Sequence, residues 1–130
     1  MKTRLWVALA MLGALAVVAA PTFAHHGAAA YSGDKTVTVT GTVSEFDFTN
    51  PHVIITMDVK NDKGAMEKWQ GELTSPNHLT RGGWSRGTLK VGDKITITGN
   101  PAKSGALSIW IRKVTGPDGK ELSTGAGGDN

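Results

Sequence analysis

The sequence contains no cysteine and few aromatic residues. Without cysteine the chain has no disulfide, no thiolate metal ligand, no thiol nucleophile and no dithiol redox pair. Aromatic residues make up only 6% of the chain, so aliphatic side chains must fill most of a core, with Trp69, Trp84 and Trp110 as its largest candidates. The fold must therefore be stable through packing and hydrogen bonding alone.

The sequence also lacks the common catalytic motifs. It has no serine-elbow motif, no phosphate-binding glycine loop and no close pair of carboxylates. The isolated acids that could act in proton transfer are explained more simply as solvated strand positions: Glu45, Asp47, Asp58 and Glu72. We therefore rank an enzyme below a binding protein.

Residues 1–24 have the composition of an export signal. Two basic residues precede an uncharged, mostly apolar run over Leu5–Ala20, which is shorter than the roughly 20 residues of a spanning helix. Ala24, with Thr22 two positions before it, provides a small-residue cleavage site. We expect cleavage after Ala24 and a periplasmic or secreted protein without a membrane contact; cleavage after Ala20 and an uncleaved anchor are the alternatives.

Removal of this segment makes the protein nearly neutral. Lys2 and Arg4 leave with it, so the 14 basic residues fall to 12 against 11 acidic ones. A nucleic-acid binder usually carries a concentrated basic surface, which this balance does not suggest. We expect no nucleic-acid partner.

Alternation of apolar and polar residues predicts a small all-β domain. Within the first strand, Gly41 indicates a bulge or sharp bend, and Phe46 and Phe48 have the opposite parity to Val43. Thr49-Asn50-Pro51 is a turn. The predicted strands cover residues 36–48, 52–60, 66–73, 94–99 and 106–114, with a short extension at 121–123.

One short helix interrupts the strands. Ser75 is a helix cap, Pro76 occupies the first helical position, and Gly82-Gly83 ends the helix. Five strands with a short helix between the third and fourth give the element order of an OB-like Greek-key barrel. Another small barrel or a sandwich fragment is the alternative. We assign an N-terminal segment at 25–34, the barrel at 35–123 and a flexible tail at 124–130.

The four histidines predict a metal site. After cleavage His25 would carry a free amine beside its imidazole, so one residue could chelate an ion, and His26 follows it directly. A third nitrogen from His52 or His78 would complete a brace-like set that favours copper, with zinc as the alternative metal. Each histidine also has a simpler explanation. His25 and His26 would begin a polar tail, His52 would hydrogen-bond the turn backbone, and His78 would be a solvated helix residue.

The length of the N-terminal segment limits whether this site can form within one chain. In an antiparallel meander the end of the first strand lies near the start of the second, whereas His25 begins from the opposite end of the barrel. The segment from His25 to Asp34 extends at most about 30 Å. It reaches His52 if the first strand is short or strongly coiled, and otherwise it reaches a second chain.

Several short motifs together resemble an uncharacterised family of small exported bacterial proteins, a domain of unknown function. The motifs are Ala24 to His26, Thr49-Asn50-Pro51-His52, Ser75-Pro76-Asn77, Gly83-Trp84 and Leu89-Lys90-Val91-Gly92-Asp93. The resemblance covers the mature chain to about residue 115 and implies a periplasmic barrel with His25, His26 and His52 as family features. It implies no activity, and the family pattern has another residue type at the position of His78.

The sequence leaves two function classes open. The first is an exported copper-binding protein for storage, delivery or protection. The second is a binding module for a small molecule, a sugar or a protein partner, since OB barrels bind ligands on strands two and three and the adjoining loops. Trp69, Trp84, Arg81 and Arg86 are candidate contributors, with core packing and solvated charges as the simpler explanation.

Overall fold

A computed structural model describes residues 27–125 of the chain. Its elements follow the predicted order: the 3-10 helix η1 (Gly27–Ala30), β1 (Val37–Asp47), β2 (Ile54–Lys60), β3 (Met66–Glu72), α2 (Pro76–Arg81), β4 (Lys94–Pro101), β5 (Ser108–Thr115) and β6 (Glu121–Leu122). Ser75 caps α2, since its hydroxyl accepts a hydrogen bond from the backbone N–H of His78 at 3.4 Å. The predicted fold class is confirmed.

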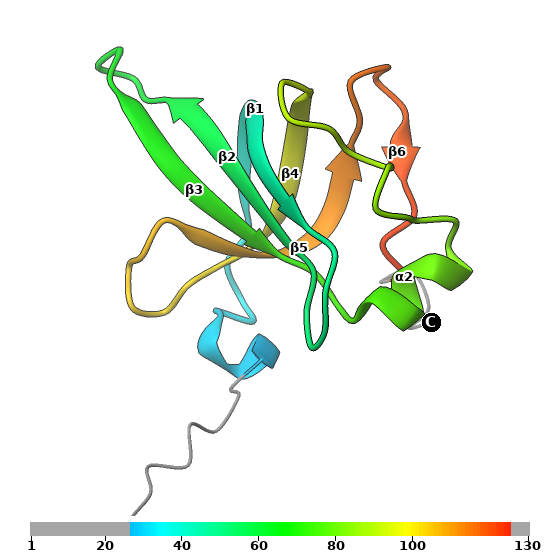
Figure 1. The fold of residues 1–130 in the computed structure, drawn as a ribbon. Helices are drawn as coiled ribbons and strands as arrows, with labels where there is room; N and C mark the ends of the chain where they lie inside the picture. Colours follow the sequence, from blue (N-terminus) through cyan, green and yellow to red (C-terminus); the bar gives the residue numbers. More distant parts are fainter. Residues whose placement is uncertain (1–26, 126–130) are drawn as a thin grey trace, which may run out of the picture.

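The strands close into a five-stranded barrel. The sheet order is β3-β2-β1-β4-β5-β6, and a parallel pairing of β3 with β5 joins the two ends, with β6 added beyond β5 (Figure 1). This closing pair is short: it covers three residue pairs, Gln70 with Ser108, Gly71 with Ile109 and Glu72 with Trp110. A meander of three strands followed by β4 beside β1 and β5 between β4 and β3 is the OB-fold topology.

The first strand, β1, is strongly bent near its middle. Thr42, at its middle, pairs with both Lys94 of β4 and Asp58 of β2, so the first half of β1 belongs to one pairing and the second half to the other. Gly41 permits this bend, because a Cβ there would lie 2.6 Å from the carbonyl oxygen of Asp58. A bulge between Val43 and Glu45 then reverses the parity of the buried positions, as the sequence predicted.

The core is aliphatic, as the composition requires. The apolar face predicted for β2 is fully inside: Val53, Ile55, Met57 and Val59 are at most 7% exposed. Trp84 is also buried, while Trp69 is only partly buried against the core. Most strand boundaries differ from the prediction by one or two residues. At β5 the shift changes the place of a side chain, since this strand begins at Ser108 and leaves Leu107 in the preceding loop with 40% of its surface exposed.

Both ends of the described chain pack onto the barrel. Tyr31, within the predicted N-terminal segment, pairs with Ala102 and is only 9% exposed. Thr124, which composition placed in the tail, is buried and donates its hydroxyl to the carbonyl of Arg112 at 2.8 Å. Within residues 27–125 no helix is long and apolar enough to cross a membrane. The predicted signal segment lies outside these residues.

Candidate functional site

His52 lies directly after the turn that joins β1 to β2. The Asn50–Pro51 peptide bond in this turn is cis, and the chain enters β2 two residues after His52. The imidazole does not bond the turn backbone: its Nδ1 pairs with Oε1 of Glu72 in a short, partly buried contact. The side chains of His52 and Glu72 are 26% and 20% exposed, so solvent reaches the pair from one side.

Glu72 joins His52 to the only tyrosine of the chain. It is the last residue of β3, where it pairs with Ile54 at the start of β2. Its second oxygen, Oε2, accepts a hydrogen bond of 2.7 Å from the hydroxyl of Tyr31, which also lies 2.9 Å from Oγ of Ser108. Burial raises the pKa of Tyr31, and so do the charge of Glu72 and the hydrogen bond to it, while the hydrogen bond with Ser108 lowers it. The result is a pKa of about 12, so the hydroxyl stays protonated and acts as a donor.

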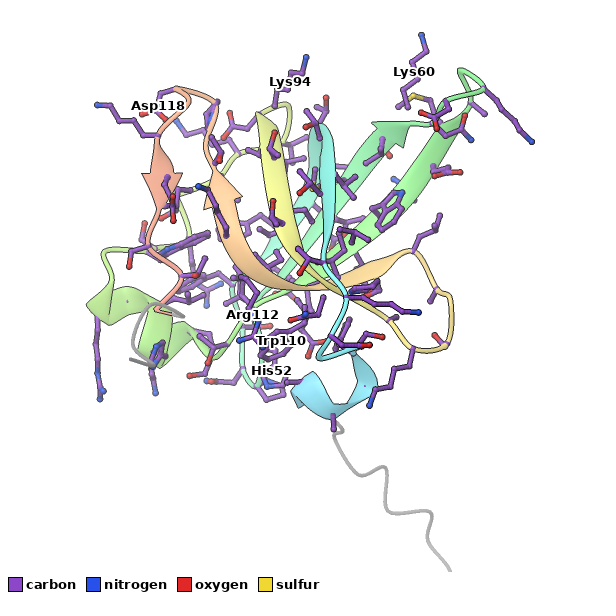
Figure 2. All side chains as sticks on the ribbon, turned by 180° about the vertical axis from the view of Figure 1, so that it is seen from behind. His52, Lys60, Lys94, Trp110, Arg112 and Asp118 are labelled. Carbon is purple, nitrogen blue, oxygen red and sulfur yellow. The ribbon has the colours of Figure 1, made fainter. Side chains whose placement is uncertain are left out.

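Trp110 forms the apolar wall of this site. The β3–β5 pairing sets it opposite Glu72, and its ring lies 5.5 Å from the His52 ring at 81°, in an edge-to-face arrangement. Its ring centroid is also 5.9 Å from that of Tyr31. Figure 2 shows His52 and Trp110 together at the end of the barrel where η1 lies.

The N-terminal segment reaches the imidazole of His52. A Cβ built on Gly27 would lie 3.6 Å from Cε1 of His52, so the backbone of Gly27 is in close proximity to the ring. Two hydrogen bonds fix this segment on the β4–β5 loop, because Lys103 donates its backbone N–H to the carbonyl of Ala30 and its Nζ to the carbonyl of Ala29. The beginning of the described chain is therefore held beside His52.

The bend of β1 makes this proximity possible. Because Thr42 is the turning point, Val37 pairs with Gly99 and Asp47 pairs with Ile54, both away from the Lys94 end of the barrel. Figure 1 shows that both halves of β1 extend from the bend toward the end of the barrel where η1 lies. This is the strongly coiled first strand that the sequence required for the N-terminal segment to reach His52.

The other predicted ligands are His25, His26 and His78. His25 and His26 lie outside the described residues. His78 is exposed on α2 and lines a cavity of about 180 Å³ that His52 does not line, with Trp110, Arg112 and Gly125 among its walls. Within residues 27–125, no three His, Asp or Glu side chains are grouped closely enough to hold a metal ion. The described part of the chain thus contains two histidines of the predicted set, His52 and His78.

Three site residues were not predicted as such from the sequence. Glu72 was expected to be a solvated acid, and Tyr31 and Trp110 were not assigned to any site. Tyr31 stands as a single aromatic residue in a stretch of small residues, which is a weak signal for an anchoring side chain. Nothing in the local sequence pairs Glu72 with His52, since the register of β2 and β3 brings them together.

Comparison with known proteins adds a family and a likeness in fold. The model of the Family of unknown function (DUF6152) matches residues 13–109. Among solved structures, the chain is similar to a crystal structure of the mitochondrial single-stranded DNA binding protein Rim1 from S. cerevisiae, with 11% identity and a TM-score of 0.48 over 63% of this chain and 92% of that chain. No match was found among curated proteins.

Proposed function

This chain belongs to the DUF6152 family of unknown function, and we propose that it is an exported metal-binding protein that holds copper at a histidine-brace-like site. The proposed ligands are the amine and imidazole of His25, as the first residue after export processing, and the imidazole of His52. The protein would store, deliver or protect against copper outside the cytoplasm.

One observation carries this proposal: the backbone of Gly27 lies against the His52 ring. Two peptide units separate Gly27 from His25, so their α-carbons are at most about 7.6 Å apart in any conformation. His26 is one unit away. A cleaved N-terminus at His25 would thus begin within reach of His52 on the same chain, without recruiting a second one.

The environment of His52 suits a metal ligand. When Nδ1–H donates to the carboxylate of Glu72, the lone pair of Nε2 remains available. A histidine ligand held by a carboxylate in this way is the common arrangement in metal sites, because the partner fixes the tautomer and the ring orientation. Tyr31 in turn holds the second oxygen of Glu72, so three side chains determine the position of one donor nitrogen.

The donor set favours copper among the divalent ions. The amine and imidazole of one residue form a chelate with little additional ordering, and a third imidazole nitrogen gives an all-nitrogen set. Such a set suits Cu(II), which has the highest affinity in the divalent series and accepts tetragonal geometry. Zinc remains the alternative ion for imidazole ligands. His78 borders a cavity that His52 does not line, so we assign it no part in this set.

Titration with Cu(II) under a competing chelator tests the proposal. Three chains are compared: one beginning at His25, one that retains Ala24 before it, and the first chain with His52→Ala. We expect tight one-to-one binding in the first chain and at least about a hundredfold weaker binding in the other two. Tryptophan fluorescence is a suitable signal, because Trp110 lies 5.5 Å from the His52 ring.

Two further variants sharpen the test. Glu72→Gln should lower the affinity about 10- to 100-fold, as loss of a second-sphere carboxylate does in other metal sites. His78→Ala is the matched control and should leave the affinity unchanged. Equal affinities for the chains that begin at Ala24 and at His25 would refute the brace, as would export processing that leaves any residue other than His25 at the N-terminus.

A further inference from the structure

A second concave site lies beside the β1–β2 turn. It is a cleft of about 560 Å³ between this turn and the segment around α2, a volume typical of small-molecule sites. Its walls include Phe48 and Asn50 from the turn, Pro76 and Asn77 from α2, and Trp84 and Arg86 from the segment after α2. The predicted metal ligand His52 is not among its lining residues.

The floor of the cleft includes two largely buried aromatic side chains. Phe48 and Trp84 are 9% and 3% exposed, and Phe46 contacts both rings, with centroids 5.8 Å from Phe48 and 6.1 Å from Trp84. The indole N–H of Trp84 is already bonded to the carbonyl oxygen of Ser123 at 2.6 Å. The floor therefore offers a ligand only the small exposed part of these two rings, and no indole donor.

Three polar side chains of the cleft have no hydrogen-bond partner in the described chain. Within residues 27–125, the side-chain amides of Asn50 and Asn77 make no hydrogen bond, and Arg86 has neither a hydrogen bond nor an ion pair. The hydroxyls of Thr49 and Thr80 are donated elsewhere, to Asp47 and to the carbonyl of Pro76. The groups left to select a ligand are thus the two amides, the guanidinium and the hydroxyl of Ser85, which accepts a hydrogen bond from the backbone N–H of Gly87 and donates none within residues 27–125.

The charge of the cleft favours an anion. No acidic residue lines it, whereas Arg86 supplies a guanidinium whose planar fork matches the two oxygens of a carboxylate. From the aromatic floor and this single cation, we infer that the cleft binds a small organic carboxylate with a flat apolar body. The body would lie in the cleft against the exposed parts of Phe48 and Trp84, and the carboxylate would pair with Arg86 near the two asparagine amides.

Benzoate is the probe for this inference, and benzamide is its uncharged counterpart. Amide-resolved NMR titration of the chain from His25, with chelator present to remove metal, should show benzoate shifting residues 48–50 and 84–86. A fragment of this size should bind with a dissociation constant on the order of 1 mM. Benzamide and acetate should each bind at least about tenfold more weakly, since each lacks one of the two interactions.

Arg86→Gln should weaken benzoate binding at least about tenfold and abolish the preference over benzamide. Arg81→Gln is the matched control, because Arg81 is an exposed cation of α2 that does not line the cleft. Arg86→Lys keeps the positive charge without the planar guanidinium, and its affinity for benzoate should lie between those of the wild type and Arg86→Gln. The inference is overturned if benzoate at about 10 mM shifts no cleft residue, if Arg86→Gln binds it equally, or if Arg81→Gln weakens it as much. Because metal is absent throughout, these outcomes are independent of the copper proposal.

Discussion

At the scale of single residues, the function of His52 depends on what surrounds its ring. The histidine alone could be a turn residue or a ligand, and its contact with Glu72 favours the second because it orients one nitrogen and leaves the other free. Tyr31 completes this arrangement from a segment more than 40 residues away in sequence from Glu72. The hydroxyl of Tyr31 is therefore the link between the N-terminal segment and the proposed metal ligand.

The pKa of Tyr31 makes this link measurable. The folded-state pKa of about 12 lies above the ordinary value of 10.0, so the folded protein retains this proton more tightly than the unfolded chain. The corresponding stability is fully present below pH 10 and is lost as the pH rises from 10 to about 12. Since Tyr31 is the only tyrosine, tyrosinate absorbance during a pH titration reports its pKa directly.

Tyr31→Phe should lower the free energy of unfolding by about 1–2 kcal/mol at neutral pH, because Glu72 and Ser108 lose a partner. Between pH 10 and 12 the unfolding free energy of the wild type should fall toward that of the variant. A tyrosinate titration centred near pH 10 in the folded protein would contradict the buried, hydrogen-bonded position.

At the scale of elements, β1 decides whether the site can form. A straight strand would carry the N-terminal segment to the far end of the barrel, whereas the bend at Gly41 turns both halves toward the same end. The bend depends on close contact of β1 with β2, where the backbone at Gly41 approaches Asp58 and Val59. A glycine in a strand of β-branched residues therefore has a structural role here.

Gly41→Ala should be destabilising by about 2 kcal/mol or more, because its Cβ would lie 2.6 Å from the carbonyl oxygen of Asp58 and 2.8 Å from a methyl group of Val59. Gly33→Ala is the control: no atom lies within 4 Å of a Cβ there, and we expect a change within about 0.5 kcal/mol. Urea unfolding measures both. Equal stability of the two variants would show that the bend tolerates a side chain.

At the scale of the whole molecule, the N-terminal segment is attached to a barrel whose core is complete without it. Every residue of the main core cluster lies at Val39 or beyond. The segment adds Tyr31, the 3-10 helix η1 and its hydrogen bonds to the β4–β5 loop. The barrel thus supplies the fold, and the attached segment supplies the proximity that the proposed site needs.

A chain beginning at Gly33 should therefore keep its β structure and lose about 2–4 kcal/mol of unfolding free energy, together with tight Cu(II) binding. Far-ultraviolet circular dichroism and urea unfolding measure the first two quantities. A chain beginning at Gly27 is the matched control, since it keeps Tyr31 and should retain stability while losing only the copper affinity. This division between barrel and attached segment is wrong if the chain beginning at Gly33 is unfolded, or if it is as stable as the chain beginning at Gly27.

Local rules accounted for most of the secondary structure. Alternating residues predicted the strands, the Ser75-Pro76 pair predicted the start of α2, and the parity change between Val43 and Phe46 predicted the bulge in β1. The error at Leu107 arose because alternation continues past the point where pairing with β4 and β3 ends. Periodicity describes which face a side chain would take and contains no information on where its partner strand stops.

The sequence by itself determined the class of fold, the cysteine-free core and the candidate histidines, because each depends on residue identity and on spacing along one chain. Only the tertiary structure decided that His52 meets Glu72, that Tyr31 holds Glu72 in place, and that the chain at Gly27 lies against the same ring. These contacts join residues from 20 to 41 positions apart, and the register of the closed barrel together with the bend of β1 brings them together. A pattern read along one chain cannot specify such contacts, since they exist only once distant strands have paired.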